Sequence, residues 1–114
     1  MKQLKAFIRE SKTDEVVQAL VKAGAPGVTV SRVRGLGYGY DPIEYTLAPG
    51  VLGKASEVTK IEVVCSEEDL DGLLHSLSEV AHTGCRGDGI VFVTPVERVV
   101  RVRTGEEGRD ALEK

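Results

Sequence analysis

The sequence is poor in the residues that build disulfide-rich or aromatic-rich proteins. It has no tryptophan, three tyrosines, two phenylalanines and two cysteines. Cys65 and Cys85 form no C-x-x-C pair and no disulfide framework, which is typical of a reducing compartment. The opening segment carries Lys5 and Arg9 within its short apolar patch, so we expect neither a signal peptide nor a membrane span there. These features predict a cytoplasmic protein that does not insert into membranes.

The chain also lacks an excess of charge of either sign. Its formal net charge is −3 at pH 7, so nothing in the overall charge predicts binding to nucleic acid. Apolar residues make up 41% and charged residues 29%, as in ordinary folded proteins. A length of 114 residues predicts a single domain over residues 1–114, with a polar tail over residues 104–114.

Hydrophobic periodicity predicts the elements of the first half. Residues 2–8 alternate apolar and polar side chains, as a strand with one solvent-facing side does. Ser11 or Thr13 is then expected to cap a helix that ends at Gly24. Residues 28–35 alternate again and predict a second strand.

The second half repeats this order. Residues 60–65, "KIEVVC", predict a strand, and Ser66 is expected to cap a helix whose apolar residues keep helical spacing as far as Ala81. Residues 90–94, "IVFVT", predict a further strand. Residues 96–103, "VERVVRVR", predict one more short strand after it.

Residues 35–57 are rich in glycine and proline and have no sustained period. A loop of about 20 residues in so small a domain is usually functional or disordered. The order β-α-β, long loop, β-α-β predicts an α+β fold of the ferredoxin-like βαββαβ type, with an antiparallel sheet and both helices on one face. Because the other face would be uncovered, we expect a closed oligomer.

The stretch "TGCRGDGIVFV", residues 83–93, sets three glycines against an apolar run. Gly84, Gly87 and Gly89 can turn successive backbone N–H groups toward one point and make a concavity that suits a phosphate. The alternative is a tight helix-to-strand connection that only needs positive φ angles. The loop by itself leaves both interpretations open.

Two arginines follow this loop. If residues 96–103 are a strand, its period of two places Arg101 and Arg103 on the same face. Two planar guanidinium groups held in parallel suit a di- or triphosphate. The alternative is a solvated edge strand whose arginines pair with Glu97 or with the acids of the tail.

The segment "TGCRGDGIVFVTPVERVVRVRTGEEGRDAL" resembles the C-terminal signature of the PII signal-transduction family. That signature reads T-G-x-x-G-D-G-[K/R]-I-F-V, followed by V-x-x-V-x-R-I-R-T-G-E-x-G. The likeness extends to "DEVVQAL" in the first helix, to "GVTVSRVRGLG" before the long loop and to "KIEVVC" after it. The chain is therefore identified as a divergent member of the PII family.

The resemblance implies a homotrimer that binds an adenine nucleotide (ADP, AMP or ATP) in clefts between neighbouring subunits. The nucleotide-binding positions of the family fall on Thr29, Gly37, Tyr38, Val64, Gly87, Asp88, Gly89, Ile90, Arg101 and Arg103. Thr29 and Val64 would line the adenine and ribose end, and the two arginines would reach the phosphates from the neighbouring subunit. Residues 37–57 would form the effector arm, which docks on a transporter or a metabolic enzyme.

Several positions depart from the family pattern. Ile90 stands where the family has a phosphate-binding lysine, which favours ADP or AMP over ATP. Tyr38 and Gly39 replace an arginine and a glutamine, and that glutamine helps to coordinate Mg²⁺ and 2-oxoglutarate. Val58 replaces the lysine that binds 2-oxoglutarate, and Val51 replaces the tyrosine that is uridylylated. We therefore expect no Mg²⁺, no usual 2-oxoglutarate sensing and no uridylylation at residue 51, with bicarbonate an open candidate as co-ligand.

Weaker signals concern the arm and the glycine loop. Three tyrosines lie in the arm and either anchor a protein partner or pack back on the base of the arm: Tyr38, Tyr40 and Tyr45. His82, Cys85 and Asp88 are spaced three apart, but with no fourth ligand in view we expect no metal site. Cys85 is either a redox-responsive thiol or simply a small residue in a turn.

No set of nucleophile, base and orienting group is apparent, so enzymatic activity is not indicated. The sequence predicts a signal-transduction regulator of the kind that serves nitrogen regulation. A different class of function stays open. In that alternative, the chain is a ligand-independent structural or interaction trimer that docks constitutively through its tyrosine-rich loop.

Overall fold

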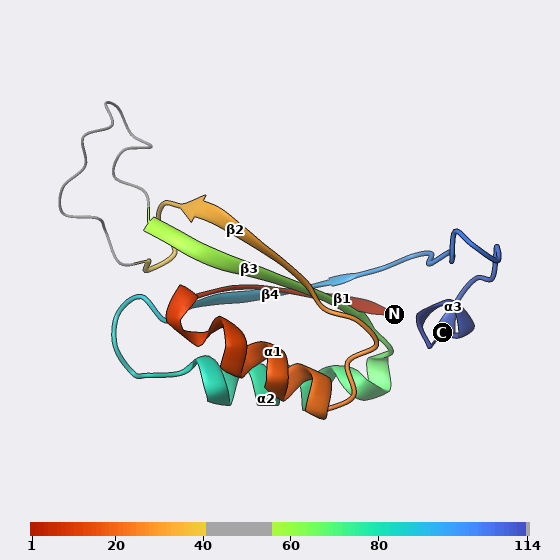
Figure 1. Cartoon of the computed structure of the whole chain (residues 1–114), viewed down its shortest axis with the longest axis horizontal. Coiled ribbons are helices and arrows are strands. Elements are labelled where there is room, and N and C mark those ends of the chain that lie inside the picture. The colour runs from red at the N-terminus through yellow and green to blue at the C-terminus, as the bar shows by residue number, and fades with distance from the viewer. Residues whose placement is uncertain (41–55, 114) are drawn as a thin grey trace.

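The computed structural model of the chain describes residues 1–40 and 56–113 and has the predicted α+β architecture (Figure 1). Four strands form one sheet in the order β2-β3-β1-β4, and every neighbouring pair is antiparallel. They are β1 (Lys2–Ile8), β2 (Thr29–Gly35), β3 (Ser56–Cys65) and β4 (Gly89–Pro95). The helices α1 (Thr13–Lys22) and α2 (Glu67–Ala81) both lie on one face of the sheet.

Strand alternation builds the core between the sheet and these helices. Leu4, Ala6 and Ile8 of β1 are buried, and the intervening side chains are more exposed. The register sets Leu4 beside Val63 and Ala6 beside Ile61 on β3, so the apolar side chains of the two strands share the helix-facing side. Five buried residues of the helices complete this core: Val16, Leu20, Leu73, Leu77 and Ala81.

The helix starts differ in detail from the sequence prediction. A short 3-10 helix (Glu10–Lys12) precedes α1, and neither Ser11 nor Thr13 caps α1 through its side chain. The Thr13 hydroxyl instead bonds the Thr59 hydroxyl on β3 at 2.7 Å, which ties the start of α1 to the sheet. Ser66 does occupy the N-cap position of α2, but its side chain makes no capping hydrogen bond.

The face of the sheet opposite the helices carries a mixed surface. On this face Phe7 lies between Lys60 and Ile90, and Lys5 lies between Glu62 and Phe92. The side chain of Phe92 is 36% exposed. Neither α1 nor α2 covers this side, so it remains the open face that the element order predicts (Figure 1).

The predicted strand over residues 96–103 is wrong. Beyond β4 the chain forms a hairpin-like turn, held by backbone hydrogen bonds from Gly108 to Val99 and from Arg101 to Glu106, and the only bridge there joins Val100 to Glu107. A short helix α3 (Arg109–Leu112) follows. Among the described residues, this alternating segment pairs with none of the four strands of the sheet.

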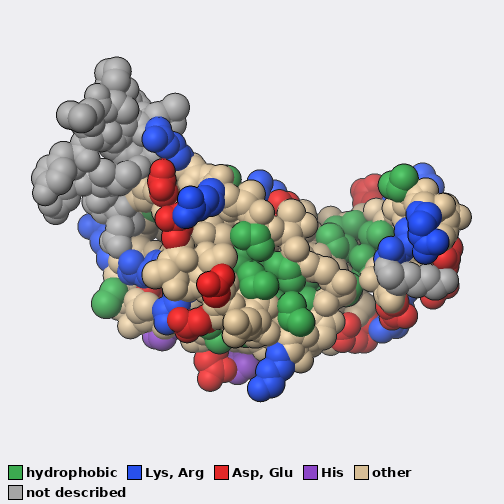
Figure 2. All heavy atoms as spheres, in the orientation of Figure 1, with side chains coloured by type: hydrophobic (Ala, Val, Ile, Leu, Met, Phe, Trp, Pro, Cys, Tyr) green, Lys and Arg blue, Asp and Glu red, His purple; other side chains and the backbone are tan. Residues whose placement is uncertain are grey.

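The C-terminal segment stands off the body of the molecule, at the end of the sheet away from residues 37–40 (Figures 1 and 2). Figure 2 shows hydrophobic side chains reaching the surface where this segment joins the body. Within the segment, Val100 is 49% exposed and Val102 is 98% exposed. In the described part of the chain, no helix has the length and apolar character needed to span a membrane.

Candidate functional site

The glycine loop joins the end of α2 to the start of β4. Gly84, Gly87 and Gly89 all have positive φ angles, at +84°, +102° and +103°. These angles favour glycine because L side chains are strained there. At Gly89 the backbone approach is also close, since an added Cβ would lie 1.8 Å from the carbonyl oxygen of Phe7.

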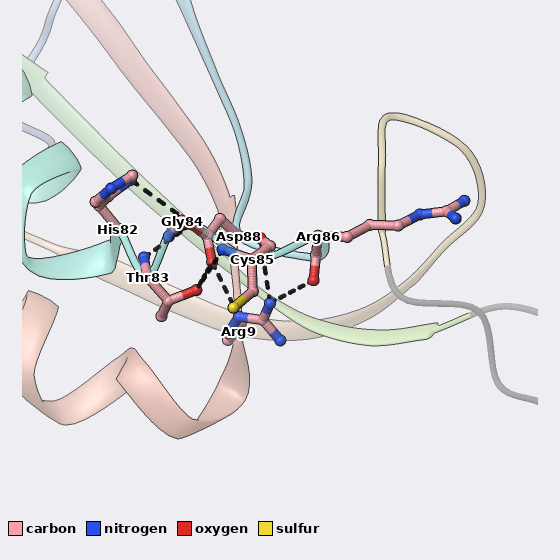
Figure 3. Close-up of polar contacts among 7 residues, drawn as sticks. All are labelled: Arg9, His82, Thr83, Gly84, Cys85, Arg86 and Asp88. Carbon is pink, nitrogen blue, oxygen red and sulfur yellow. Dashed lines mark hydrogen bonds and ion pairs between the residues drawn. The ribbon is translucent and has the colours of Figure 1, made fainter.

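The Asp88 carboxylate lies inside this loop and accepts hydrogen bonds from several donors (Figure 3). The backbone N–H groups of Thr83 and Gly84 donate to Oδ2 at 2.8 Å and 2.9 Å. Oδ1 accepts from the Thr83 hydroxyl and, at 3.1 Å, from Nε of Arg9. Arg9 also donates to the carbonyl groups of Cys85 and Arg86.

These contacts control the charge of Asp88. The hydrogen bond from the Thr83 hydroxyl, followed by the backbone donors and Arg9, holds the pKa of the Asp88 carboxyl well below its usual range. The carboxylate is therefore ionised throughout the physiological pH range. Its negative charge is directed to donors of its own loop and to the Arg9 guanidinium, rather than toward solvent.

This arrangement corrects part of the predicted anion site. The N–H groups of Thr83 and Gly84 do converge on an anion, but that anion is the chain's own Asp88 carboxylate. The N–H of Cys85 likewise stays within the loop, where it donates to the Thr83 hydroxyl oxygen. The amides of residues 83–85 are therefore all used within the loop. The side chain of Arg86 points away from the Asp88 cluster (Figure 3).

The two cysteines have different environments. Cys85 is an exposed free thiol in the loop, and Cys65 is a buried free thiol whose pKa is raised by burial.

His82 Nδ1 lies 3.7 Å from Asp88 Oδ2. Among residues 1–40 and 56–113, no group of three His, Cys, Asp or Glu side chains is arranged to hold a metal ion.

A second set of predicted site residues gathers around a cavity of about 350 Å³ at the other end of the sheet. Thr29, Val64 and Arg101 line it together. The Arg101 guanidinium donates twice to the carbonyl oxygen of Ala111, at 3.1 Å and 2.8 Å, which fixes its position beside the cavity. Arg103 is exposed within the turn, so the expected parallel pair of arginines on one strand face is not formed in a single chain.

The two sets of residues are far apart within one chain. Thr29 is on the edge strand β2 and Gly89 is on the opposite edge strand β4, with β3 and β1 between them. Three strand spacings of about 4.8 Å separate them by roughly 14 Å across the sheet alone. Along the sheet, the glycine loop lies at the end where β2 finishes, whereas the Arg101 segment lies at the opposite end (Figure 1).

The base of the arm is built from aromatic side chains. Gly37, Tyr38 and Gly39 have positive φ angles of +85°, +49° and +78°, and the N–H of Tyr40 closes this turn on the carbonyl of Gly37. Tyr38 is 64% exposed, and its ring centroid lies 5.5 Å from that of Phe92 on the open face.

Tyr40 is packed against its own chain rather than exposed. Its ring lies directly over Gly35, where an added Cβ would come within 2.3 Å of the ring, and its centroid is 6.5 Å from that of Phe7. Its side chain is only 8% exposed, and this burial raises the pKa of the phenol. The alternative of packing on the base of the arm therefore describes Tyr40. Tyr45 and Val51 lie outside the described residues.

Comparisons with known proteins identify the family. A family model described as "Nitrogen regulatory protein P-II" matches residues 1–106. Relatives named nitrogen regulatory protein P-II from Azospirillum brasilense and Synechocystis are 43% and 42% identical over 98% of this chain and all of theirs. The crystal structure of Arabidopsis thaliana PII bound to citrate matches with a TM-score of 0.80 at 36% identity, over 96% of this chain and 90% of that one. The chain belongs to the P-II family.

P-II membership settles the broad class of function. P-II proteins are regulators rather than enzymes, and the chain is accordingly a signal-transduction regulator. The proteins of this family are trimers that bind small-molecule effectors and target proteins.

In this P-II chain, sequence reasoning missed Arg9, which directly follows β1. Only the register that sets Ile8 beside Gly89 brings it to the glycine loop.

Proposed function

We propose that this P-II chain is a homotrimeric regulator that binds an adenine nucleotide in each cleft between neighbouring subunits. One subunit would contribute the glycine loop (Gly87–Ile90) and the arm base at Gly37 and Tyr38. Its neighbour would contribute Thr29, Val64, Arg101 and Arg103. The observation that carries this proposal is the placement of the two sets of residues at opposite ends of one sheet. Each set is half of a site, and a second copy supplies the other half.

Neighbouring copies also account for the exposed apolar surface. Val102 is almost fully exposed in the single chain, and Phe92 and Tyr38 leave apolar area on the open face. Exposed apolar patches of this kind favour burial against another copy. Arg103, which lies in the same turn as Val102, would be brought to the neighbour's glycine loop by such packing.

The ligand is expected to be ADP or AMP in preference to ATP. Ile90 lies beside Phe7 on the open face and offers no charge to a β- or γ-phosphate. A charge-assisted hydrogen bond of that kind typically contributes about 1.5–3 kcal/mol. Calorimetry in which ATP with Mg²⁺ binds at least tenfold tighter than ADP and AMP would count against this preference.

Regulation by 2-oxoglutarate in the usual manner of the family is not part of the proposal. Val58, at the position of the lysine that binds 2-oxoglutarate, is only 5% exposed. Gly39 has no side-chain oxygen for Mg²⁺, a cation that takes oxygen ligands. Tyr40, one residue further, is packed on Gly35. We therefore expect neither Mg²⁺ nor 2-oxoglutarate to bind there. Bicarbonate stays a candidate co-ligand to be screened.

The output of the regulator would be a protein contact made through residues 37–57. A transporter or a metabolic enzyme of nitrogen or other inorganic-nutrient uptake is the proposed target, with Tyr38 and Tyr45 as candidate anchors. We expect the protein to act in the cytoplasm, as P-II proteins typically do.

The test is thermal stabilisation of the protein by ADP. A ligand that binds only the folded state stabilises it by about 2.7 kcal/mol at a hundredfold excess over Kd. The double variant Arg101→Ala with Arg103→Ala should abolish this stabilisation. Arg98→Ala is the matched control, because Arg98 lies in the same segment and pairs with Glu107 at 2.6 Å outside the proposed site.

A result in which ADP stabilises the double variant as strongly as the wild type would refute the nucleotide site. The second candidate function would then be favoured: a ligand-independent interaction trimer that docks constitutively through the tyrosine-rich arm. Tyr38 supports that candidate, because an aromatic ring that is 64% exposed suits a docking contact.

A further inference from the structure

The glycine loop is closed by two side chains, one from the loop itself and one from the far end of β1. Arg9 comes from the junction of β1 and the 3-10 helix. Thr83 is the first residue of the loop, since α2 ends at Ala81 and His82 is its C-cap. Both side chains bond Oδ1 of Asp88, while the N–H groups of Thr83 and Gly84 bond Oδ2 (Figure 3). Both oxygens of the carboxylate are thus held, and only 23% of its side chain is exposed.

We propose that Arg9 and Thr83 are positioning residues for the nucleotide site. By holding the Asp88 carboxylate inside the loop, they fix the backbone of Gly87–Ile90 in the conformation that receives the phosphates. This inference rests on the proposed function and adds two residues to it that would not touch the nucleotide. Arg9 also fixes the loop backbone directly, because it donates to the carbonyls of Cys85 and Arg86.

The direction of the Asp88 side chain matters electrostatically. A carboxylate turned toward the mouth of the loop would repel a phosphate, since like charges at close range in a partly desolvated site are unfavourable. Bonding to Arg9 neutralises that charge and keeps it on the inner side. The carbonyls of Cys85 and Arg86 likewise accept from Arg9.

A competing interpretation makes Asp88 an internal substitute for the ligand, which a phosphate would displace. It predicts the opposite sign, because removing the carboxylate charge would then strengthen nucleotide binding. The structure favours positioning. Displacement would break four hydrogen bonds to Asp88 at once.

The experiment is calorimetric titration of the native oligomer with ADP. Thr83→Val keeps the shape of the side chain and removes its hydroxyl, and Arg9→Gln removes the guanidinium. Each should weaken ADP binding roughly five- to tenfold, because the competent loop conformation becomes a smaller fraction of the population. Asp88→Asn should weaken binding as well, since its amide N–H₂ would face other donors.

Two further variants serve as controls. Thr83→Ser retains the hydroxyl and should restore the Kd for ADP to within about twofold of the wild type. Arg32→Gln removes a more exposed arginine that pairs through Nε with Glu10, the residue after Arg9, at 2.8 Å. That variant should leave the Kd for ADP unchanged. The melting temperature of each variant without ADP separates lost folding from lost binding.

The outcomes are distinct. If Thr83→Val and Arg9→Gln lower the unliganded melting temperature but bind ADP like the wild type, the contacts are only structural and the positioning role is wrong. Tighter ADP binding by Asp88→Asn would overturn it in favour of the displacement interpretation. If the wild type itself binds no adenine nucleotide, the proposed function fails and this inference fails with it.

Discussion

Gly89 is the residue at which the glycine loop enters the sheet, and it combines two requirements that only glycine meets. Its φ angle is +103°, and an added Cβ would overlap the carbonyl oxygen of Phe7. Backbone contact of this kind cannot be relieved by rotating a side chain. At the residue scale, Gly89 therefore has a structural role in the chain whether or not a nucleotide binds nearby.

Gly89→Ala is accordingly expected to reduce the free energy of unfolding by about 3 kcal/mol or more. Gly24→Ala is the matched control, because Gly24 has a similar φ of +92° but nothing within 4 Å of an added Cβ. That variant should lose only about 1–2 kcal/mol from backbone strain. Urea unfolding measures both, and equal losses would show that the close approach to Phe7 does not matter.

Asp88 makes stability depend on pH at the acidic end. Because its pKa is lowered in the folded state, its contribution to stability is complete above the pKa of about 3.9 that an aspartate has in an unfolded chain. The contribution is lost as the pH falls below that value. Thr83→Val removes the largest cause of the lowered pKa, so the variant should lose less stability than the wild type between pH 5 and pH 3.

Urea midpoints at several pH values across that window check this prediction. Thr83→Ser should follow the wild type, because it keeps the hydroxyl. Curves for wild type and Thr83→Val that run parallel from pH 5 to pH 3 would mean that the Thr83 hydroxyl does not stabilise the Asp88 carboxylate.

At the element scale, the arm base is attached to the sheet by Tyr40 rather than by backbone pairing. The ring fills the space that Gly35 leaves above β2 and approaches Phe7 of β1. Glycine at position 35 and tyrosine at position 40 are therefore complementary in shape. The turn at residues 37–39, with three consecutive positive φ angles, brings the ring back to this position.

Tyr40→Ala should therefore cost about 2–4 kcal/mol of unfolding free energy, in the range for large-to-small changes at buried sites. Tyr38→Ala, two residues away, should change stability by less than about 1 kcal/mol because its ring is 64% exposed. Urea unfolding of the two variants compares them directly. Similar values for the pair would show that Tyr40 does not anchor the arm.

The sequence predicted the four strands and two long helices because each alternates or repeats over a buried face. It failed at residues 96–103, where alternation of valine and arginine is compatible with a strand but none of the described strands pairs with this segment. The glycine loop was predicted as an anion site without recognising that Asp88 is itself the anion for two of its amides. Tertiary contacts account for both differences. The Arg101 guanidinium donates to the carbonyl of Ala111, and the guanidinium of Arg9, directly after β1, donates to the Asp88 carboxylate.

At the scale of the whole molecule, the chain has one covered and one open sheet face, with the proposed half-sites at opposite ends. The C-terminal segment projects from the body and carries Val102, which is 98% exposed (Figures 1 and 2). A protruding apolar residue next to an unpaired half-site is expected of a subunit whose site is completed by its neighbour. The trimer that we propose would therefore be needed for ligand binding and not only for stability.

Mixed trimers test this central claim most directly. Arg101→Ala with Arg103→Ala inactivates one half-site, and Gly87→Asp places a carboxylate in the other, so each variant alone should bind no ADP. When the two variants are coexpressed in equal amounts, about three of every four trimers should be mixed. Each mixed trimer has one intact cleft out of three, so about a quarter of the wild-type ADP sites should be regained. Mixed trimers that bind no more ADP than either parent would contradict a cleft shared between neighbouring copies.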